Sequence, residues 1–306
     1  MSRWITALAV LLLLQCGLVA AVYWQGENQK ILDRQSLAYF PGKTIDEVRI
    51  GDEFDNEVIL VKHEKFWLVE SIDLLPANPV MVKSLLRSVV GRDHGWPVAE
   101  SSAARQRFQV ADYYYQRRLE FFSGGAPLGT IYLGTSPGFR RVHARNHQQD
   151  AIYSISFNAF DAPAAGGSWL EPKLLQVRSM LEIVADSYSL HYDNGKWRSG
   201  IGGVPDSREL EALLNAIETL QIDGVASQEA QRELATAEAD LTLTIRSLGG
   251  EATREVFTLE GQHYIHSSDY PQFFKLSAYD FDRLTGIDFA LLSGEVPPSP
   301  APQGVQ

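Results

Sequence analysis

The residues in this 306-residue chain with the clearest potential for chemistry are two pairs of histidines. His143 and His147 lie four positions apart, with Asp150 three positions further on, and on a helix that spacing would present two imidazoles to one zinc ion. The segment lacks the glutamate of a metalloprotease motif and lies in a predicted loop, so solvated histidines are the favoured interpretation. His263 and His266 occupy the corresponding place later in the chain. Strand alternation would put them on opposite faces, so no metal site is predicted.

Other catalytic patterns are only partly matched. Ser136 lies between two glycines as in a G-x-S-x-G nucleophile motif, but a second strand follows it instead of a helix. Cys16 is the single cysteine and lies in an apolar run, so neither a disulfide nor a cysteine nucleophile is expected. The glycine pairs lack the helix and the lysine of a phosphate-binding loop, and we interpret them as turns: 124–125, 166–167, 202–203 and 249–250. We therefore predict no catalytic residue and no cofactor.

Three consecutive tyrosines followed by arginines form the strongest binding pattern, in residues 113–118. Tyrosine and arginine are favoured at the centres of protein interfaces, although a strand with alternately buried rings is also consistent with this segment. A second basic group, in residues 140–145, could meet a carboxylate-rich partner or a glycan, or lie solvated in a loop. The predicted interaction surface consists of Tyr113, Tyr114, Tyr115, Arg117, Arg140, Arg141 and Arg145.

The elements that must position these residues begin with an apolar segment. Residues 4–24 carry no charge, and as a helix they would span about 31 Å, which matches a hydrocarbon core. Arg3 precedes the segment, so the positive-inside tendency predicts a single pass of the bacterial inner membrane with the body in the periplasm. An uncleaved anchor is favoured over a cleaved signal peptide and over a lipoprotein signal processed at Cys16.

The charge of the chain restricts its partners. With 27 Lys and Arg against 38 Asp and Glu, the net charge is −11, which argues against nucleic acid as a ligand. The body beyond the anchor is also acidic, so we do not expect it to adhere to anionic lipid headgroups.

The body of the chain repeats a pattern of elements. Residues 58–70 and 188–200 each alternate apolar and polar residues around a polar centre, as β-hairpins do. Each hairpin precedes an amphipathic helix, the first after Asn78 and the second after Asp206. Strands joined at a Gly-Gly turn, and then an aromatic run, follow in both halves.

This repetition predicts an α+β fold with two tandem units, each an antiparallel sheet with one or two helices. The expected boundaries are a membrane anchor at 1–24, a spacer at 25–40, units at 41–165 and 166–293, and a Pro-rich disordered tail at 294–306.

Several of these features resemble one protein family. The hairpin KFWLV at 65–69 before a helix, the segment RFQVADYYYQRRLEFFSGG at 107–125, and the strand TIYLG at 130–134 are similar to the family named domain of unknown function 4340. Members of that family often stand beside genes of gliding-motility-type ABC transporters. The resemblance implies an envelope-anchored accessory protein, with ABC transporter permease subunits as partners, and it implies no catalytic residue.

Three functions follow as hypotheses. The first is a non-enzymatic accessory or scaffold protein that acts through protein–protein contact, with the open sheet edges offering a surface for strand addition. The second is a module that binds a small ligand or a glycan in a crevice between the units, with Trp169, Trp197 and the tyrosine cluster as its walls. The third, and least favoured, is an envelope hydrolase, which a buried carboxylate or histidine with a partner in one cleft would favour.

Overall fold

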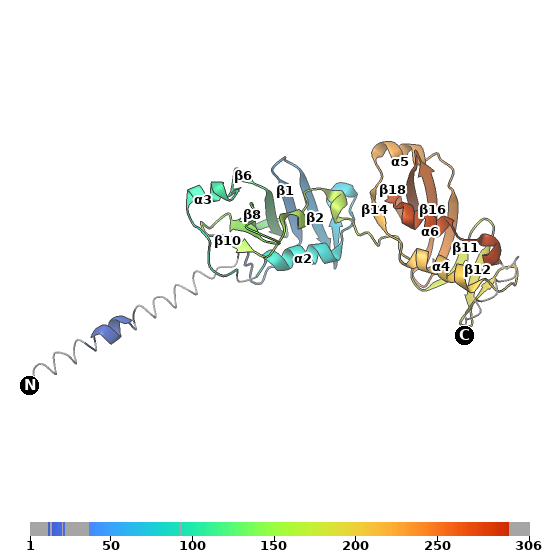
Figure 1. Ribbon diagram of the computed structural model, residues 1–306, viewed down its shortest axis with the longest axis horizontal. Coiled ribbons are helices and arrows are strands. Elements are labelled where there is room, and N and C mark those ends of the chain that lie inside the picture. The colour runs from blue at the N-terminus through green and yellow to red at the C-terminus, as the bar shows by residue number, and fades with distance from the viewer. Residues whose placement is uncertain (1–11, 13, 20, 22–36, 92–93, 294–306) are drawn as a thin grey trace, which may run out of the picture. The chain divides into compact units, whose positions relative to one another are not determined.

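The computed structural model of this chain describes residues 12, 14–19, 21, 37–91 and 94–293, which form two compact units that divide between Trp169 and Leu170 (Figure 1). The predicted tail and most of the predicted anchor and spacer lie outside the described residues. Among those that are described, no helix is both long enough and apolar enough to cross a membrane. Cys16 is described, and it is exposed and unpaired.

The first unit is built on an eight-stranded antiparallel sheet. Along β2 (Glu57–His63), the buried residues Val58 and Leu60 alternate with more exposed ones, as in a sheet with one face in a core. A tight turn with Glu64 at a φ of 53° joins β2 to β3 (Phe66–Val69). In spatial order the strands are β10 (Ile152–Ile155), β9 (Val142–Asn146), β8 (Ala126–Leu133), β7 (Arg117–Ser123), β1 (Glu47–Asp52), β2 (Glu57–His63), β3 (Phe66–Val69) and β4 (Leu75–Pro76).

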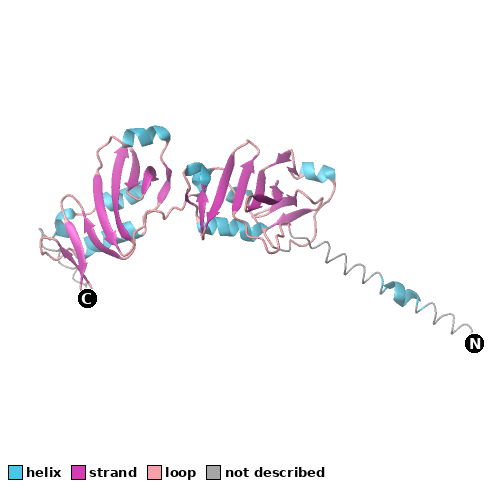
Figure 2. Ribbon diagram, turned by 180° about the vertical axis from the view of Figure 1, so that it is seen from behind, coloured by secondary structure: helices cyan, strands magenta, loops and turns pink. Residues whose placement is uncertain are grey.

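Helix α2 (Pro79–Val89) lies along one face of this sheet (Figure 2). The Asn78 side chain caps the helix by accepting hydrogen bonds from Val80 N at 3.0 Å and Met81 N at 3.3 Å, and the helix begins after Asn78 as predicted. The buried side of α2 joins a core that also contains Phe121 and Trp169. The remaining elements are α3 (Ser102–Arg107), the two-stranded ribbon of β5 (Val110–Ala111) and β6 (Tyr114–Tyr115), and the 3-10 turns η1 (Glu70–Ile72), η2 (Ala159–Asp161) and η3 (Gly166–Trp169).

The second unit also contains an eight-stranded antiparallel sheet. The turn between β12 (Ser189–Asp193) and β13 (Lys196–Ser199) is Asn194-Gly195, with φ values of 50° and 80°, as the Asn-Gly pair predicts for a tight hairpin. In spatial order the strands are β13 (Lys196–Ser199), β12 (Ser189–Asp193), β11 (Met180–Val184), β15 (Leu241–Ser247), β16 (Gly250–Leu259), β17 (Gln262–Ser267), β18 (Tyr270–Leu276) and β14 (Ile222–Val225).

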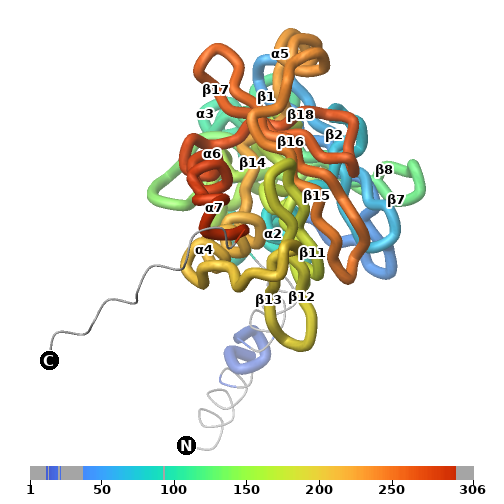
Figure 3. The backbone as a smooth tube through the Cα atoms, turned by 90° about the vertical axis from the view of Figure 1, so that its right-hand side faces the viewer, coloured from blue at the N-terminus to red at the C-terminus, as the bar shows by residue number. Residues whose placement is uncertain are grey.

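Three helices of the second unit, α4 (Ser207–Glu218), α6 (Ala278–Thr285) and α7 (Phe289–Ser293), lie on one side of its sheet (Figure 3). Asp206 caps α4 by accepting hydrogen bonds from Arg208 N at 2.9 Å and Glu209 N at 3.2 Å, and the helix begins after Asp206 as predicted. A fourth helix, α5 (Gln228–Leu234), packs on β16 and β18.

The two units share one strand order. In each, a three-stranded meander precedes a helix, and a four-stranded meander then pairs its first strand with the first strand of the unit. The two large antiparallel sheets with their helices confirm the predicted α+β class. The units differ in where the eighth strand lies: β4 extends the β3 edge of the first sheet, whereas β14 extends the β18 edge of the second.

Candidate functional site

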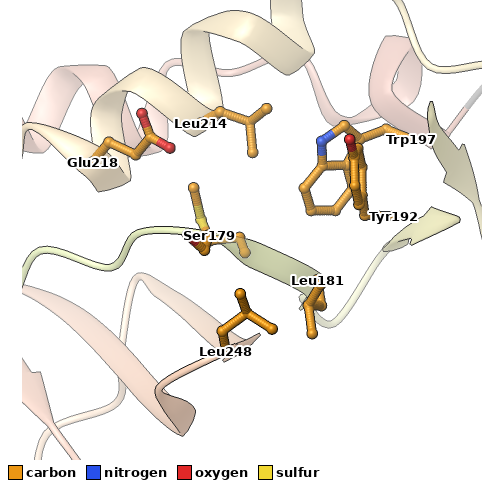
Figure 4. Close-up of a pocket in the computed structure, with 8 residues that line it drawn as sticks. Ser179, Leu181, Tyr192, Trp197, Leu214, Glu218 and Leu248 are labelled. Carbon is orange, nitrogen blue, oxygen red and sulfur yellow. The ribbon is translucent and has the colours of Figure 1, made fainter. Parts of the chain in front are cut away.

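The second unit contains a half-open groove between α4 and the β11 end of its sheet, with a volume of about 350 Å³. Figure 4 shows two residues of α4 on one side, two leucines on the other, and an aromatic pair at one end. The lining residues are Ser179, Met180, Leu181, Tyr192, Trp197, Leu214, Glu218 and Leu248.

Tyr192 and Trp197 form the aromatic end of the groove. They are directly opposite each other across the β12–β13 hairpin, with ring centroids 5.5 Å apart and ring planes at 55°. Tyr192 lies two positions after the buried Leu190 along β12, so both side chains project from the same face of the sheet. The hairpin extends beyond the cover of α4, and 45% of Tyr192 remains exposed.

The other walls are mainly apolar, with the polar Ser179 and one charged residue. Leu214 comes from α4, and Leu248 from the β15–β16 turn, where 78% of its surface is exposed. Glu218, at the last turn of α4, is the one ionisable acid or base among the lining residues apart from the Tyr192 phenol. A groove of this kind can accept an apolar side chain and place a positive charge beside the carboxylate.

Trp197 also lies on the edge strand β13 of the sheet. In a hairpin with a two-residue turn, Asp193 and Lys196 exchange hydrogen bonds, and the next pair, Tyr192 and Trp197, directs its backbone groups away from the partner strand. The N–H and C=O of Trp197 therefore face outward from the edge. Groove and open backbone groups meet at this one residue.

The predicted tyrosine cluster is only partly exposed. Tyr113, at the β5–β6 turn, is 78% exposed, and Gln109 Nε2 donates a hydrogen bond of 2.5 Å to the hydroxyl of Tyr114. Tyr115 packs against the buried Tyr132, with ring centroids 5.3 Å apart. The structure thus favours the alternative interpretation for Tyr115, a ring on a strand that is partly buried.

The predicted arginines occupy three different environments. Arg117 donates to the carbonyl of Ala162 at 3.0 Å and shares a surface hollow with the acidic residues around Asp52. Arg140 lies over the ring of the exposed Phe139, at 5.3 Å. Arg141 binds the carbonyl oxygen of Ser154 at 2.5 Å and its hydroxyl at 2.9 Å. The exposed basic group is thus confined to the β8–β9 loop.

Arg145 does not belong to an exposed surface, because its side chain is 1% exposed within β9. Its guanidinium donates to the carbonyl of Val110 at 2.7 Å and to three carbonyls at 3.1–3.2 Å in the β9–β10 connection, and it pairs with Asp112. Burial is tolerated because the donors are satisfied. This arginine fastens the segment before β6 to the sheet.

Tyr132 and His147 lie beside the Arg145–Asp112 pair. The Tyr132 hydroxyl is 3.3 Å from His147 Nδ1, and that nitrogen is 3.7 Å from Asp112 Oδ2. Burial, and secondarily the charge of Asp112, raise the pKa of Tyr132. The phenol therefore stays protonated at neutral pH, and the cluster offers no activated nucleophile there.

The histidines are arranged differently from the predicted loop. His143 lies on β9 with 7% of its surface exposed, stacks on Phe108 at 4.0 Å, and contacts Thr135 through Nδ1. Burial lowers the pKa of its imidazole. The prediction of a solvated loop was wrong for His143, because three-dimensional packing buries all five residues of β9, whereas His147 lies in the turn after β9 and is exposed as predicted. Asp150 pairs with Arg105 instead of with a histidine.

The remaining candidates also have structural partners. His263 stacks on Phe281 at 3.8 Å, whereas His266 binds Glu255 at 2.8 Å. Ser136 donates to the carbonyls of Gly138 and Arg141, both at 2.7 Å, in the β8–β9 loop. Within residues 37–91 and 94–293, no group of three His, Cys, Asp or Glu side chains is arranged to hold a metal ion.

Trp169 is not a wall of a ligand crevice. It is fully buried in the core of the first unit, and its indole N–H donates to the carbonyl of Pro163 at 2.8 Å. Trp197, the other tryptophan predicted to line a crevice between the units, lines the groove within the second unit. The sequence analysis missed Tyr192, although the Asn194-Gly195 turn already fixes its register opposite Trp197.

Comparison with protein-family models matches residues 67–242 to a family described as Domain of unknown function (DUF4340). Neither the curated proteins nor the solved structures gave a match. The family match covers more than half of the chain and agrees with the resemblance seen in the sequence. The chain belongs to the DUF4340 family.

Proposed function

We propose that this member of the DUF4340 family is a non-enzymatic accessory protein that serves an ABC transport system in the envelope. In this proposal, residues 4–24 anchor it in the bacterial inner membrane and both units lie in the periplasm, where they bind protein partners such as permease subunits. The observation that carries the proposal is the half-open apolar groove at the β13 edge of the second unit.

The walls of this groove favour a protein partner. Exposed apolar side chains such as Leu248 and Tyr192 lose unfavourable hydration when a partner covers them. Tryptophan and tyrosine are also the residues that most often dominate the free energy of protein interfaces. A membrane anchor would strengthen binding at this small surface, because confinement near the partner raises the effective concentration of the two proteins.

Crosslinking in intact cells tests this proposal. The tagged full-length chain is crosslinked, purified in mild detergent, and analysed by mass spectrometry beside a version whose residues 1–24 come from an unrelated anchored protein. We expect permease or ATPase subunits to co-purify with both forms. Enrichment with neither form, relative to an unrelated anchored control, would contradict the proposal. Enrichment with the native anchor alone would move the contact from the units to the membrane segment.

A second function, binding of a glycan or another small ligand, is favoured by one specific observation. The groove volume of about 350 Å³ lies in the range of small-molecule sites, and the Tyr192–Trp197 pair offers ring faces to a sugar. Native mass spectrometry of the full chain with cell-wall glycan fragments tests this alternative. Two results together would replace the accessory proposal. The first is saturable glycan binding that Trp197→Ala abolishes, and the second is the absence of transporter subunits from the crosslinking experiment in cells.

A further inference from the structure

We propose that the β13 edge at Trp197 is a strand-addition site, which takes an extended segment of a partner protein that is both apolar and positively charged. This inference rests on the proposed function and names the chemistry of the partner. The incoming strand would bond to the outward N–H and C=O of Trp197, and one of its apolar side chains would enter the groove beside Tyr192.

The first unit already contains such a strand, supplied by its own chain. There β4 pairs with β3, and the N–H of Ala77 donates a 2.8 Å hydrogen bond to the carbonyl of Trp67. Trp67 is the counterpart of Trp197, since each follows a two-residue turn at the same position of its hairpin. Leu75 and Ala77 are 3% and 4% exposed, so the added segment is apolar and buried.

The second unit cannot close its edge in the same way. Asn78 and Asp206 hold equivalent places, because each caps the helix after the hairpin and each donates its own N–H to a carbonyl at the end of its unit, Trp169 or Leu291. The residue before the cap is Ala77 in the first unit and Pro205 in the second. Proline has no N–H to donate.

The chain between β13 and α4 forms a tight turn instead of a strand. Within the described part of the chain, Ser199 N bonds to the carbonyl of Gly203 and Gly202 N bonds to that of Ser199, at 3.1 and 2.9 Å. No backbone N–H among the described residues bonds to the Trp197 carbonyl as Ala77 bonds to that of Trp67. The edge therefore keeps an open acceptor at the mouth of an apolar groove.

Side-chain differences between the units create the groove. The helices align from their caps, so Leu214 and Glu218 of α4 correspond to Leu86 of α2 and to Val90, the residue that follows α2. In the first unit Leu86 and Val90 pack against the core, and the chain at Ala38 forms a bridge with Val90. In the second unit the same positions line the opening, and the apolar valine is replaced by the exposed Glu218.

Charge defines the partner further. Residues 170–293 contain 10 Lys and Arg against 20 Asp and Glu, a net charge of −10, whereas residues 37–169 contain 14 against 15, a net charge of −1. Lys196 and Arg198 flank Trp197, but strand alternation directs them to the opposite face, so Glu218 is the charge at the groove. A basic segment is attracted to this unit, while a second copy of the unit is repelled.

Peptide binding to the full chain in mild detergent tests the inference. The probe is a short fluorescent peptide in which lysine alternates with leucine and valine. Its binding is measured by fluorescence anisotropy. We expect saturable binding, which Trp197→Ala weakens at least about tenfold. Trp96→Ala is the matched control, because Trp96 is 66% exposed in the first unit, and it should leave binding unchanged.

Two modified peptides separate strand addition from simple attraction. N-methylation of the central peptide amides removes the backbone donors and should weaken binding at least about tenfold, because the Trp197 carbonyl then has no partner. Replacing each lysine by glutamate should abolish binding. Equal binding of the methylated peptide, or of the Trp197→Ala chain, would overturn the inference.

Cell experiments with Trp197→Ala distinguish this inference from the proposed function. If transporter subunits still co-purify with the variant, the accessory function stands and the Trp197 site is contradicted. If the peptide binds as expected but no transporter subunit is enriched with the unmodified chain, the site stands and the transport assignment is contradicted. A dimer in light scattering that Trp197→Ala dissociates would replace the basic segment by a second copy of this chain.

Discussion

The two units of this chain have the same strand order but differ at the edge beyond their tryptophan hairpin. The first unit adds β4 there, and the N–H of Ala77 donates a hydrogen bond to the outward carbonyl of Trp67. The second unit places Pro205 at the equivalent position and adds its extra strand, β14, at the other edge. One topology therefore yields a closed edge in one unit and an open edge in the other, according to where a single short strand pairs.

The opposite edges show the reverse relation. In the second unit β14 pairs with β18 over several residues, whereas in the first unit the corresponding contact with β10 is a single bridge between Ala99 and Ile152. The helices that follow are also alike, because Ser101 and Ser227 cap α3 and α5 in the same way. The comparison indicates that a sheet edge in this fold is closed or opened by a few residues without change to the core.

The largest difference between the units is expected from Trp169 and Trp197, which the sequence analysis proposed as walls of the same ligand crevice. Trp169→Ala should reduce the stability of the first unit by about 3–5 kcal/mol, because it empties a fully buried site. Trp197→Ala should cost the second unit much less, since its side chain is only half-buried. Native-state hydrogen exchange, which reads each unit separately, measures both. Equal losses would show that Trp197 is a core residue and not a groove wall.

A reciprocal exchange at the residues before the helix caps should have an intermediate effect. Ala77→Pro removes the donor to the Trp67 carbonyl and should destabilise the first unit by about 1–3 kcal/mol. Pro205→Ala should change the second unit by at most about 1 kcal/mol, through the entropy of its unfolded chain. Amide exchange around β3 and β13 provides the measurement. A large loss for Pro205→Ala together with none for Ala77→Pro would break the comparison.

The smallest effect concerns pH. Burial lowers the pKa of His143 below its ordinary value of 6.5, so the folded first unit resists protonation. As the pH falls below 6.5, the unfolded chain gains a proton that the folded unit does not, and the stability present above 6.5 is progressively lost until the folded pKa is reached. His143→Gln should flatten this part of the stability curve. An NMR titration of the His143 ring with a midpoint above 6.5 would contradict the assignment.

Local signals in the sequence account for much of this fold. Asn78 and Asp206 begin helices because their side chains accept the first free N–H groups, and the Asn194-Gly195 turn sets the β12–β13 register. These interactions involve neighbours along the chain, so they can be predicted without tertiary structure. The same holds for the Gly124-Gly125 turn that joins β7 to β8, and for the β15–β16 connection, where Gly249 lies in the turn and Gly250 begins β16.

The parts that could not be predicted depend on distant contacts. Residues 142–146 look polar enough for a loop, yet they form a buried strand because Arg145 finds carbonyl partners that include Val110, which lies 35 positions earlier. The groove had no signal of its own, since Leu214 and Leu248 resemble ordinary apolar residues of a helix and a turn. Their exposure follows only from how far α4 covers the sheet.

Site-specific photocrosslinking in intact cells, with a photoreactive amino acid placed at Tyr192 or at its first-unit counterpart Lys62, tests the open edge most directly. These positions lie opposite Trp197 and Trp67 on equivalent hairpins. The open edge of the second unit predicts adducts to a partner protein from position 192, at least about tenfold above those from position 62. Equal adducts from both positions, or adducts from position 62 alone, would contradict the claim that the second unit carries the binding edge.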